Sequence, residues 1–515
     1  MLKSLQGFFA DFNKKADRNP DRIFAKFNGE ALTFATLNKQ SATFAAELRR
    51  KGVQRGDRVA VMMRNSRLSL ALLFGIARSG AIWVPVNTHQ KGEGLRYILD
   101  HSKPRLLVCD QELLPSVVDC HAGIRSEAVV TVGQPYDRRS LETVLQKELA
   151  FADVRIEADD LFAIMYTSGT TGRPKGVLVT HGMLRLAGEA ARILTAMKPG
   201  DVFFVWEPLF HIGGAQLITL PIIEDVTLAM VDRFSASSFW SQVRDAGATH
   251  IHYLGGILQI LLKKPESDLD RQHLVRIAWG GGCPMDVWPK FRDRFGVEMR
   301  ECYGMTEASS ITTCNIEGVV GSVGKPMPWY TVDVVDERGN RIAPGSRGEI
   351  VVRSLLEGSL FKGYLDNQEA TDKALVGGVL HTGDSGTLDI EGNLWLHGRI
   401  TDSVRCKGEN VSAWEVEHVA AGHPAVEDCA MIGVTADIGE QDIKLFVKAK
   451  KGKTIEPEHL SGWLAERLAS YQNPRYIEVV GEFERTPSQR IMKHLLPTDL
   501  NNCWDRMATQ QSTPA

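Results

Sequence analysis

The chain has 515 residues, which predicts about three folding units at roughly 150 residues per domain. Hydrophobic residues make up 43% and charged residues 24%, as in ordinary globular proteins, so a disordered chain or a coiled coil is disfavoured. The 60 basic and 63 acidic residues give a net charge of −3, which offers no overall basic field for nucleic acid or an anionic membrane.

Helical and strand patterns alternate along the first 150 residues. Apolar residues at helical spacing predict a helix over 32–52, which ends on Gly52, and a second helix over 68–78. Apolar segments also predict buried strands at 57–63, 81–86, 200–204, 249–252 and 275–279. Alternation of this kind predicts parallel sheets covered by helices.

The most informative pattern is a polar loop between two apolar strands. A strand over 161–166 leads into Thr-Ser-Gly-Thr-Thr-Gly-Arg-Pro-Lys-Gly at 167–176, and a second strand follows over 177–179. Glycines let backbone N–H groups approach phosphate oxygens, hydroxyl groups add donors, and the lysine balances charge. Pro174 stands where a Walker A loop has glycine, five residues after Gly169, which disfavours a P-loop kinase or GTPase. We therefore predict a phosphate-binding loop here rather than a flexible linker.

The pattern changes after about residue 325. Short strands separated by turns indicate a small all-β unit, with strands at 331–335, 349–352 and 394–396. From about residue 402 the sequence predicts a compact α+β segment, with strands at 430–434 and 444–448 and helices near 415–421 and 458–470. Residues 501–515 are polar, so we expect a frayed tail.

The cysteines and the apolar stretches indicate the compartment. No two of the eight cysteines lie within four residues of each other, so the sequence has no C-x-x-C pair for zinc or redox chemistry. Scattered cysteines in a long chain are typical of reduced cytosolic thiols. The first residues lack the apolar run of a signal peptide, and the most apolar stretches, 68–77 and 212–223, are shorter than a membrane helix of roughly 20 residues. We expect a cytoplasmic protein with no transmembrane segment.

The loop over 167–176 resembles the signature loop of the adenylate-forming superfamily, which comprises acyl-CoA synthetases, nonribosomal peptide adenylation domains and luciferases. The resemblance runs from about Leu32 to Leu496. Within it, residues 234–243, together with the loop motifs, are most similar to the crotonobetaine/carnitine-CoA ligase group.

The resemblance implies an α/β fold in two parts. A large N-terminal body over 1–400 would contain two α/β subdomains and a small β unit. A mobile α+β C-terminal domain over 401–500 would follow, with a tail over 501–515. In the superfamily the smaller domain turns about a hinge, which falls on Thr401 with Asp402 next.

Other motifs follow in the order that the superfamily has them. Tyr-Gly-Met-Thr-Glu at 303–307 resembles the adenine and magnesium motif. By resemblance Tyr303 stacks on adenine, Thr306 reaches the α-phosphate and Glu307 holds Mg²⁺, a hard cation that prefers carboxylate oxygen. The resemblance assigns ATP or AMP binding to Thr167, Ser168, Gly169, Thr170, Thr171, Gly172, Lys175, Gly281, Gly282, Cys283, Glu301, Cys302, Tyr303, Gly304, Met305, Thr306, Asp384 and Arg399, with Thr167 as a second metal contact and the last two as the ribose-binding pair.

Pro-Leu-Phe-His at 208–211 resembles the loop that borders the acyl pocket, with His211 near the substrate carboxylate where the thiol enters. The implied walls of the pocket are Trp206, His211, Leu254, Gly255, Gly282 and Met305. Apolar residues and glycines at these positions predict a small or medium acyl chain. No carboxylate is clearly placed to bind a quaternary ammonium group, so carnitine-type acids are not favoured.

Two positions depart from the superfamily's pattern. Lys407, Gly408 and Glu409 lie in a segment that resembles the hairpin along the pantetheine tunnel, where Gly-Gly is usual in place of Lys-Gly. A lysine there either obstructs the tunnel or attracts a CoA phosphate. Arg490 stands where the superfamily has a lysine that bridges the substrate carboxylate, the α-phosphate and the ribose. Arginine keeps the charge but directs its donors differently, and Lys493 is an alternative provider of the cation.

Together these motifs predict an ATP-dependent carboxylate–CoA ligase that forms an acyl-adenylate and then an acyl-CoA thioester. The predicted catalytic residues are His211, Thr306, Glu307 and Arg490, with ATP, Mg²⁺ and coenzyme A as cofactors or cosubstrates and no nucleic-acid partner. Two alternatives stay open: transfer of the acyl group to a carrier protein, or a nucleotide-binding relative whose adenylation is weak because of Arg490. We expect a homodimer, because dimers are the commonest symmetric oligomers.

Overall fold

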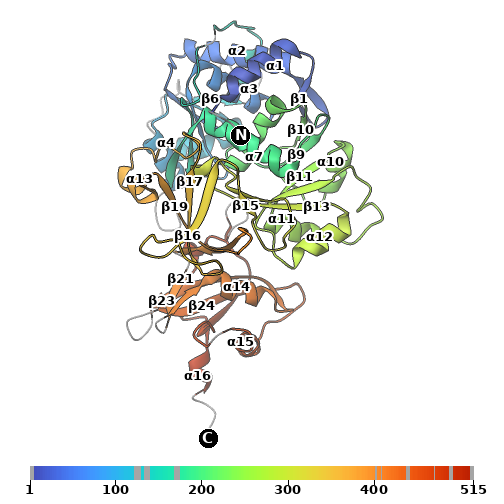
Figure 1. Cartoon of the computed structure of the whole chain (residues 1–515). Helices are drawn as coiled ribbons and strands as arrows, with labels where there is room; N and C mark the ends of the chain where they lie inside the picture. The colour runs from blue at the N-terminus through green and yellow to red at the C-terminus, as the bar shows by residue number, and fades with distance from the viewer. Residues whose placement is uncertain are drawn as a thin grey trace. The chain divides into compact units, whose positions relative to one another are not determined.

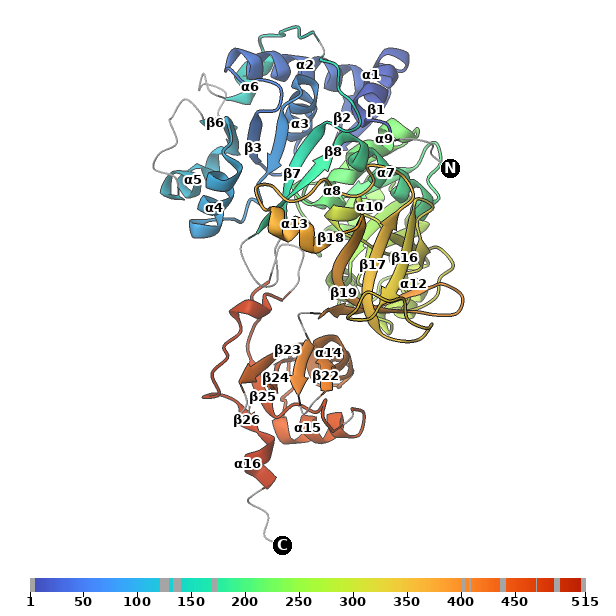
Figure 2. The same ribbon diagram turned by 60° about the vertical axis from the view of Figure 1, so that its left-hand side comes forward.

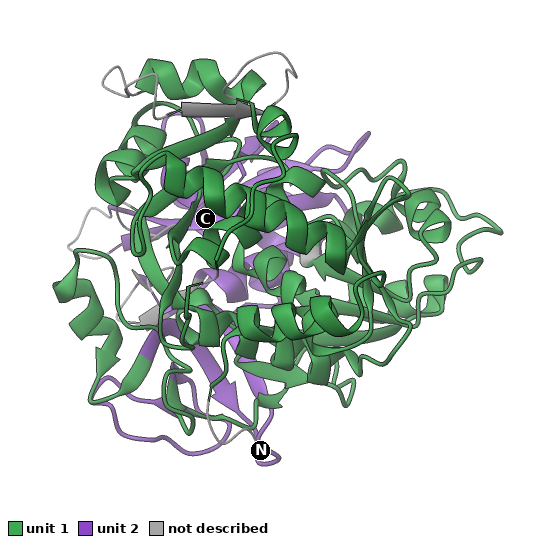
Figure 3. Cartoon of the chain, turned by 90° about the horizontal axis from the view of Figure 1, so that it is seen from above, with its two compact units in different colours: residues 1–332, 352–380 green, residues 333–351, 381–515 purple. Residues whose placement is uncertain are grey.

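The computed structural model, shown in Figure 1 and Figure 2, describes residues 5–120, 129–132, 140–152, 154–167, 174–400, 403–406, 409–435, 441–468, 470–485 and 491–510. The chain divides into two compact units, residues 1–332 with 352–380 and residues 333–351 with 381–515 (Figure 3). Helices and sheets are mixed along the chain, which confirms the predicted α/β class. The domain boundary expected at residue 400 stays a prediction.

A six-stranded sheet in the first unit has the order β6-β5-β3-β4-β7-β8. Its strands are β3 (Arg58–Met62), β4 (Ile82–Pro85), β5 (Leu106–Asp110), β6 (Val129–Val132), β7 (Leu161–Thr167) and β8 (Lys175–Thr180). The strands run parallel except in the β7–β8 hairpin. The helices along this stretch are α2 (Phe34–Arg50), α3 (Arg67–Ser79), α4 (Gly92–Ser102), α5 (Leu114–Cys120) and α6 (Leu141–Leu145). The alternation predicted over the first 150 residues is therefore confirmed.

The two faces of this sheet carry different helices, because successive side chains of a strand point to opposite faces. Leu107 of β5 packs in one cluster with Leu95 of α4 and Val117 of α5. Leu106, its neighbour in the strand, lines a small cavity with Phe44 of α2. Burial on both faces explains why these strands are almost continuously apolar.

A nine-stranded sheet in the same unit has the order β15-β14-β13-β12-β11-β9-β10-β1-β2, and Figure 1 shows β1, β10, β9, β11 and β13 in succession. Its strands are β1 (Ile23–Phe27), β2 (Glu30–Thr33), β9 (Val202–Val205), β10 (Thr227–Met230), β11 (His250–Leu254), β12 (Ile277–Gly281), β13 (Glu298–Tyr303), β14 (Thr313–Asn315) and β15 (Lys325–Pro326). The six strands from β1 to β13 in this order run parallel, and β2, β14 and β15 are antiparallel to their neighbours. The strands predicted at 200–204, 249–252 and 275–279 are confirmed as β9, β11 and β12.

The remaining α-helices of this region are α1 (Phe8–Arg18), α7 (His181–Thr195), α8 (Ile212–Ala215), α9 (Leu220–Ile223), α10 (Phe239–Asp245), α11 (Gly255–Leu262) and α12 (Val287–Phe295). Four of them, α8, α10, α11 and α12, come after strands β9, β10, β11 and β12 of the nine-stranded sheet. A buried cluster packs α10, α11 and α12 against β9, β11 and β12, with Phe239, Leu258 and Phe291 at its centre. Each of these three side chains is 1% exposed or less, so the cluster excludes water and stabilises the strands that carry the site.

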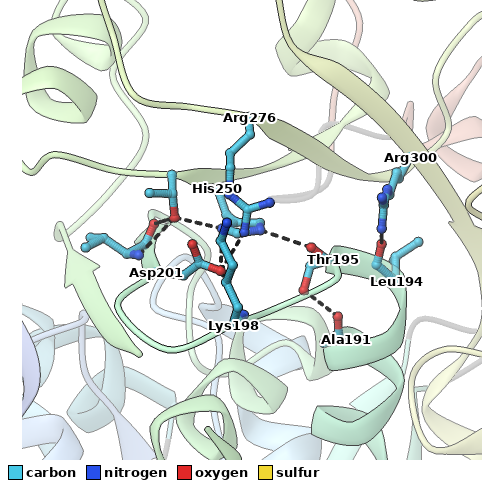
Figure 4. Close-up of polar contacts among 10 residues, drawn as sticks. Ala191, Leu194, Thr195, Lys198, Asp201, His250, Arg276 and Arg300 are labelled. Carbon is cyan, nitrogen blue, oxygen red and sulfur yellow. Dashed lines mark hydrogen bonds and ion pairs between the residues drawn. The ribbon is translucent and has the colours of Figure 1, made fainter. Parts of the chain in front are cut away.

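Figure 4 shows polar contacts that join the amino ends of β9, β11 and β12. Asp201 precedes β9, is 3% exposed, and accepts hydrogen bonds from Lys198 N at 2.9 Å and from Arg276 Nη2 at 2.6 Å. His250, the first residue of β11, donates from Nε2 to Thr195 O at 3.1 Å. Burial lowers the pKa of His250 to about 4, so the ring is neutral. These contacts fix the amino ends of three strands and thereby align their carboxyl ends.

Replacing Asp201 with alanine is expected to destabilise the protein by about 2–4 kcal/mol, because Arg276 and Lys198 N lose a buried acceptor. The loss should be visible as a lower Tm in thermal denaturation. The exposed pair Arg292–Asp293 is the control, and Asp293→Ala should leave the Tm unchanged. Equal Tm values for the two variants would show that the Asp201 contacts do not stabilise the fold.

The chain from residue 330 to residue 399 forms a five-stranded sheet of order β16-β17-β19-β18, with β20 beside β19. Its elements are β16 (Tyr330–Val335), β17 (Gly348–Ser354), α13 (Gln368–Ala374), β18 (Leu375–Val376), β19 (Val379–Leu388) and β20 (Leu394–Arg399). The strands predicted at 331–335, 349–352 and 394–396 are confirmed. This sheet is the small β unit that the sequence predicts.

The C-terminal part has a hairpin, β21 (Ser403–Cys406) with β22 (Glu409–Ser412), and a four-stranded sheet of order β23-β24-β25-β26. Its other elements are α14 (Ala413–Ala421), β23 (Val426–Thr435), β24 (Gln441–Ala449), α15 (Pro457–Ala465), β25 (Tyr476–Val480), β26 (Trp504–Asp505) and α16 (Arg506–Gln510). The α+β segment predicted from residue 402 is confirmed.

The end of the chain is ordered further than expected. A frayed tail is predicted from residue 501, yet Trp504 pairs with Ile477 in the sheet and packs against the core. Arg475 holds the adjacent Asp505 with Nε–Oδ1 at 3.4 Å, which explains why the chain stays docked. Residues 511–515 lie outside the described part. Among the helices described, none combines the length and the apolar character needed to cross a membrane.

Candidate active site

The carboxyl ends of β9, β11, β12 and β13 lie at one edge of the nine-stranded sheet, because these strands are adjacent and parallel. Each end leads into a predicted motif. Trp206 and the loop to His211 follow β9, while Leu254, Gly281 and Tyr303 are the last residues of β11, β12 and β13. Ligands of open α/β sheets bind outside this edge. The structure therefore brings the predicted acyl-pocket and adenine-binding residues to the same edge.

The buried carboxyl group of Glu301 holds the glycine-rich turn after β12. Its Oε1 accepts hydrogen bonds from Gly282 N and from Cys283 N, the latter at 3.1 Å. Its Oε2 accepts a hydrogen bond from Tyr253 Oη at 2.7 Å. Gly282 has a φ of +80°, and a Cβ on Gly280 would lie 1.9 Å from Tyr253 O, so both positions require glycine. The turn is thus held in one conformation beside the carboxyl ends of the strands.

Because of the buried Glu301 carboxyl group, we expect the stability of the folded protein to depend on pH. Burial raises the pKa of Glu301 from 4.5 to about 8. The folded protein keeps this proton up to about pH 8, whereas the unfolded chain releases it near 4.5, so the contribution of Glu301 to stability is lost as pH rises between these values. In Glu301→Gln this loss is absent, and the Tm of the variant relative to the wild type should rise between about pH 5 and pH 8. A Tm difference that stays constant over this range would contradict the prediction.

The Tyr-Gly-Met-Thr-Glu motif forms a tight turn whose acidic end is buried. Tyr303, Thr306 and Glu307 are each 7% exposed or less. A Cβ on Gly304 would lie 1.8 Å from a backbone carbonyl oxygen, so the turn needs glycine there. Glu307 Oε1 accepts a hydrogen bond from Tyr364 Oη at 2.9 Å. The turn therefore holds one carboxylate in a fixed orientation.

Tyr364 joins this carboxylate to the predicted phosphate loop. Lys175 Nζ lies 4.9 Å from the centre of the Tyr364 ring, a cation–π distance, while the hydroxyl of the same ring binds Glu307. Thr167 and Lys175 face each other as Cα partners at the loop end of the β7–β8 hairpin. Residues 168–173 of the loop between them, among them Ser168, Gly169, Thr170, Thr171 and Gly172, lie outside the described residues. Tyr364 is absent from the sequence prediction, because nothing in its local sequence marks it.

The predicted acyl-pocket side chains range from buried to half-buried. Trp206 is 5% exposed, and His211, Leu254 and Met305 are half-buried. His211 stands at the start of α8 with its ring 4.7 Å from that of Phe210. Gly255, the first residue of α11, follows Leu254 directly.

Two thiols near the same edge are not nucleophiles in this environment. Burial, reinforced by the Glu301 carboxyl group, raises the pKa of Cys283 and of Cys302 well above the ordinary range. Because only a thiolate attacks readily, these cysteines stay inert at neutral pH.

The predicted ribose pair lies together in the second unit. Asp384 on β19 and Arg399 on β20 are Cα partners, and Arg399 Nε binds Asp384 Oδ1 at 2.9 Å. Arg399 Nη1 also donates to Thr382 O at 2.8 Å, and Thr382 Oγ1 accepts from Asp384 N at 3.1 Å. Asp384 is 7% exposed, and Arg399 holds its carboxylate.

Several predicted residues cannot be placed. Thr401, Asp402, Lys407, Gly408 and Arg490 lie outside the described residues, so their roles stay predictions. The backbone of Glu409 pairs with Cys406 in the β21–β22 hairpin. Lys493, the alternative to Arg490, forms an ion pair with Glu417 Oε1 at 2.8 Å.

The family models and the curated relatives cover most of the chain. A model described as AMP-binding enzyme matches residues 12–365, and a model described as AMP-binding enzyme C-terminal domain matches residues 415–490. The crotonobetaine/carnitine–CoA ligase of Salmonella arizonae is 31% identical over 498 residues, which cover 92% of this chain and 94% of that protein. The protein of the same name from Citrobacter koseri is 30% identical and covers 90% of this chain and 92% of its own.

Solved structures agree in fold. ATP-bound MatB from Rhodopseudomonas palustris superposes with a TM-score of 0.87 at 28% identity, covering 95% of this chain and 98% of that one. The o-succinylbenzoate CoA synthetase MenE from Bacillus subtilis, in complex with AMP, gives a TM-score of 0.83 at 25% identity and covers 96% and 98%. Together with the site at the carboxyl edge, these matches show that the chain belongs to the AMP-binding enzyme family.

Proposed function

We propose that this chain is an ATP-dependent carboxylate–CoA ligase, which converts a small or medium acid to an acyl-adenylate and then to an acyl-CoA thioester. The observation that carries the proposal is the buried carboxylate of Glu307, joined through Tyr364 to Lys175 beside the predicted phosphate loop. Relatives named as CoA ligases at about 30% identity over most of the chain support it.

In the first step an oxygen of the substrate carboxylate attacks the α-phosphorus of ATP, and the bond to pyrophosphate breaks. This step needs no nucleophile from the protein, only orientation of the reactants and neutralisation of the developing charge. Lys175 and the loop N–H groups would bind the phosphates, Thr306 the α-phosphate, and Tyr303 the adenine ring. Arg490 would bind the reacting carboxylate and phosphate.

Glu307 fits a magnesium ion that arrives with ATP. Magnesium in nucleotide sites is held by one or two carboxylates together with phosphate oxygens. The part of the chain that the structure describes has no cluster of three or more His, Cys, Asp or Glu side chains that could hold a metal ion by themselves. Phosphate oxygens of the nucleotide would therefore supply the other ligands. Bound there, with Thr167 as a second contact, the ion would neutralise phosphate charge.

In the second step the sulfur of CoA attacks the acyl carbon, the bond to AMP breaks, and the thiol proton is released. His211, at the start of α8, would stand where the thiol enters. Asp384 and Arg399 would bind the ribose. We assign the hinge to Thr401 and Asp402, and the CoA-facing hairpin to residues 407–409.

We place this reaction in the cytoplasm, because eight cysteines scattered along a long chain without a C-x-x-C pair are typical of reduced cytosolic thiols. We further propose a homodimer, the commonest assembly among symmetric oligomers. Sedimentation velocity of the purified protein measures the assembly directly.

The test incubates the protein with ATP, Mg²⁺, CoA and a panel of acids, and follows pyrophosphate exchange, AMP and thioester separately. Acid-dependent exchange followed by thioester formation is the expected result. Exchange without a thioester would point instead to a carrier protein as acceptor. ATP binding without exchange for any acid would indicate a nucleotide-binding relative and would overturn the proposal.

A further inference from the structure

A buried pair of polar side chains, Glu207 and His252, lies at the carboxyl edge and has no role in the two steps above. Glu207 follows β9 after Trp206, and His252 lies in the adjacent parallel strand β11. His252 Nδ1 and Glu207 Oε1 are in hydrogen-bond contact, with side-chain exposures of 8% and 4%. A carboxylate only accepts, so Nδ1 carries the hydrogen.

The second oxygen of this carboxylate lacks a partner. Glu207 Oε2 is buried and has no hydrogen-bond partner among the residues that the structure describes. Leaving a charged acceptor unsatisfied in a buried position is unfavourable, so native proteins seldom keep one without a ligand or a water molecule to fill it. The pair thus uses Oε1 internally and leaves Oε2 as an acceptor for another molecule.

The position of the pair favours the acyl group of the substrate as that molecule. Trp206 Nε1, from a predicted wall of the acyl pocket, donates to His252 O at 3.0 Å. Leu254, another predicted wall, is two residues beyond His252 on the same strand, and both therefore face the same side of the sheet. The Trp279 ring lies 4.4 Å from the His252 ring, edge to face. Aromatic and aliphatic side chains around one carboxylate suit a carbon chain with one polar substituent.

The backbone at Glu207 is also fixed. Asn65 Nδ2 donates to Glu207 O at 2.7 Å, and Asn65 Oδ1 accepts from Leu209 N at 3.1 Å. Asn65 therefore bridges the two ends of the segment that leads to the His211 loop. An acceptor held this rigidly discriminates between ligands better than a mobile one, because little ordering is needed on binding.

We infer that Glu207 is a specificity-determining residue whose Oε2 accepts a hydrogen bond from a hydroxyl or ammonium group on the acyl chain of the substrate acid. The inference rests on the proposed CoA-ligase function and narrows its substrate to acids that carry such a donor. Sites built around a buried polar group reject analogues that lack its partner, often by large factors.

The experiment compares kcat/KM for four acids of equal chain length: unsubstituted, hydroxylated, amino-substituted and trimethylammonium-substituted. The wild type should prefer the hydroxylated or the amino acid over the unsubstituted acid by at least about tenfold. Comparing the hydroxylated acid with the amino-substituted acid shows whether the preferred donor is a hydroxyl or an ammonium group. The trimethylammonium acid carries charge without an N–H donor and should show no comparable preference.

Two variants locate the preference. Glu207→Gln replaces the acceptor oxygen with an amide that can turn its N–H₂ toward the substrate, and the preference ratio should fall at least about fivefold. Glu189→Gln is the control, because Glu189 is also buried, at 9% exposed against 3% for Glu207, but has both oxygens held, by Arg185 at 2.6 Å and Arg192 at 2.7 Å. Its ratio should equal that of the wild type. Because the ratio is measured within one preparation, a partly unfolded variant does not change it.

Three results would overturn the inference: equal kcat/KM for donor and unsubstituted acids in the wild type, an unchanged ratio in Glu207→Gln, or an equal preference for the trimethylammonium acid. The first needs no variant. If no acid supports adenylation, the proposed function is wrong, but this result does not test the inference about Glu207. The same four acids are then compared by isothermal titration in the presence of a non-hydrolysable ATP analogue, where tighter binding of a donor acid supports the inference and equal binding overturns it.

Discussion

Replacing Glu307 with glutamine is expected to slow acid-dependent pyrophosphate exchange by about 10²–10³-fold. The amide has nearly the same shape and can still accept the hydrogen bond from Tyr364 Oη, so the turn should stay folded. What it loses is the negative charge that binds a magnesium ion on the triphosphate. Exchange measured over a series of Mg²⁺ concentrations should show a higher Mg²⁺ requirement in the variant.

Tyr364→Phe is the control for this experiment. It removes the hydroxyl that binds Glu307 but keeps the carboxylate and the ring beneath Lys175. The loss of one hydrogen bond to a charged group should slow exchange by roughly tenfold, with little change in the Mg²⁺ requirement. If Tyr364→Phe were as slow as Glu307→Gln, the carboxylate would act through the tyrosine rather than on the metal.

Arg490 is expected to act in the first step alone. In Arg490→Ala, pyrophosphate exchange should fall by about 10²-fold, because one cation that neutralises charge at the α-phosphate is removed. Thioester formation from a chemically prepared acyl-adenylate should change by less than about threefold. Arg490→Lys should recover most of the exchange, because it keeps the charge and places it where the superfamily has a lysine.

Lys493 supplies the comparison for Arg490. Its ammonium group is already paired with Glu417 in the second unit, so Lys493→Ala should leave exchange close to the wild-type rate. The opposite pattern, a large loss in Lys493→Ala and none in Arg490→Ala, would move the catalytic cation to Lys493. Comparable losses in both half-reactions would instead mean that Arg490 maintains the fold.

Local patterns predicted the secondary structure well. The strands at 200–204 and 249–252 are confirmed, because a short apolar run between turn residues is a local signal. The frayed tail was a wrong prediction for Trp504, whose order comes from pairing with Ile477. A polar sequence does not reveal that one tryptophan in it reaches a distant strand.

Some residues of the candidate site were predicted from the sequence and others were not, again because local patterns do not reveal contacts between distant segments. Asp384 and Arg399 were identified from their motifs, and they are paired on neighbouring antiparallel strands that lie close in sequence. Tyr364 and Glu207 were not identified, because each meets its partner across a large loop. Glu307 lies 57 residues from Tyr364, and Glu207 lies 45 residues from His252.

The near-neutral, ordinary composition by itself determined little beyond a globular chain of several folding units. The motifs predicted more: a phosphate-binding loop between two strands, and a series of candidate nucleotide-binding segments in a fixed order. Only the tertiary structure decided which side chains meet at the carboxyl edge. Parallel strands become neighbours through long crossovers, so the contact of Glu207 with His252 depends on the packing of the whole sheet rather than on any local pattern.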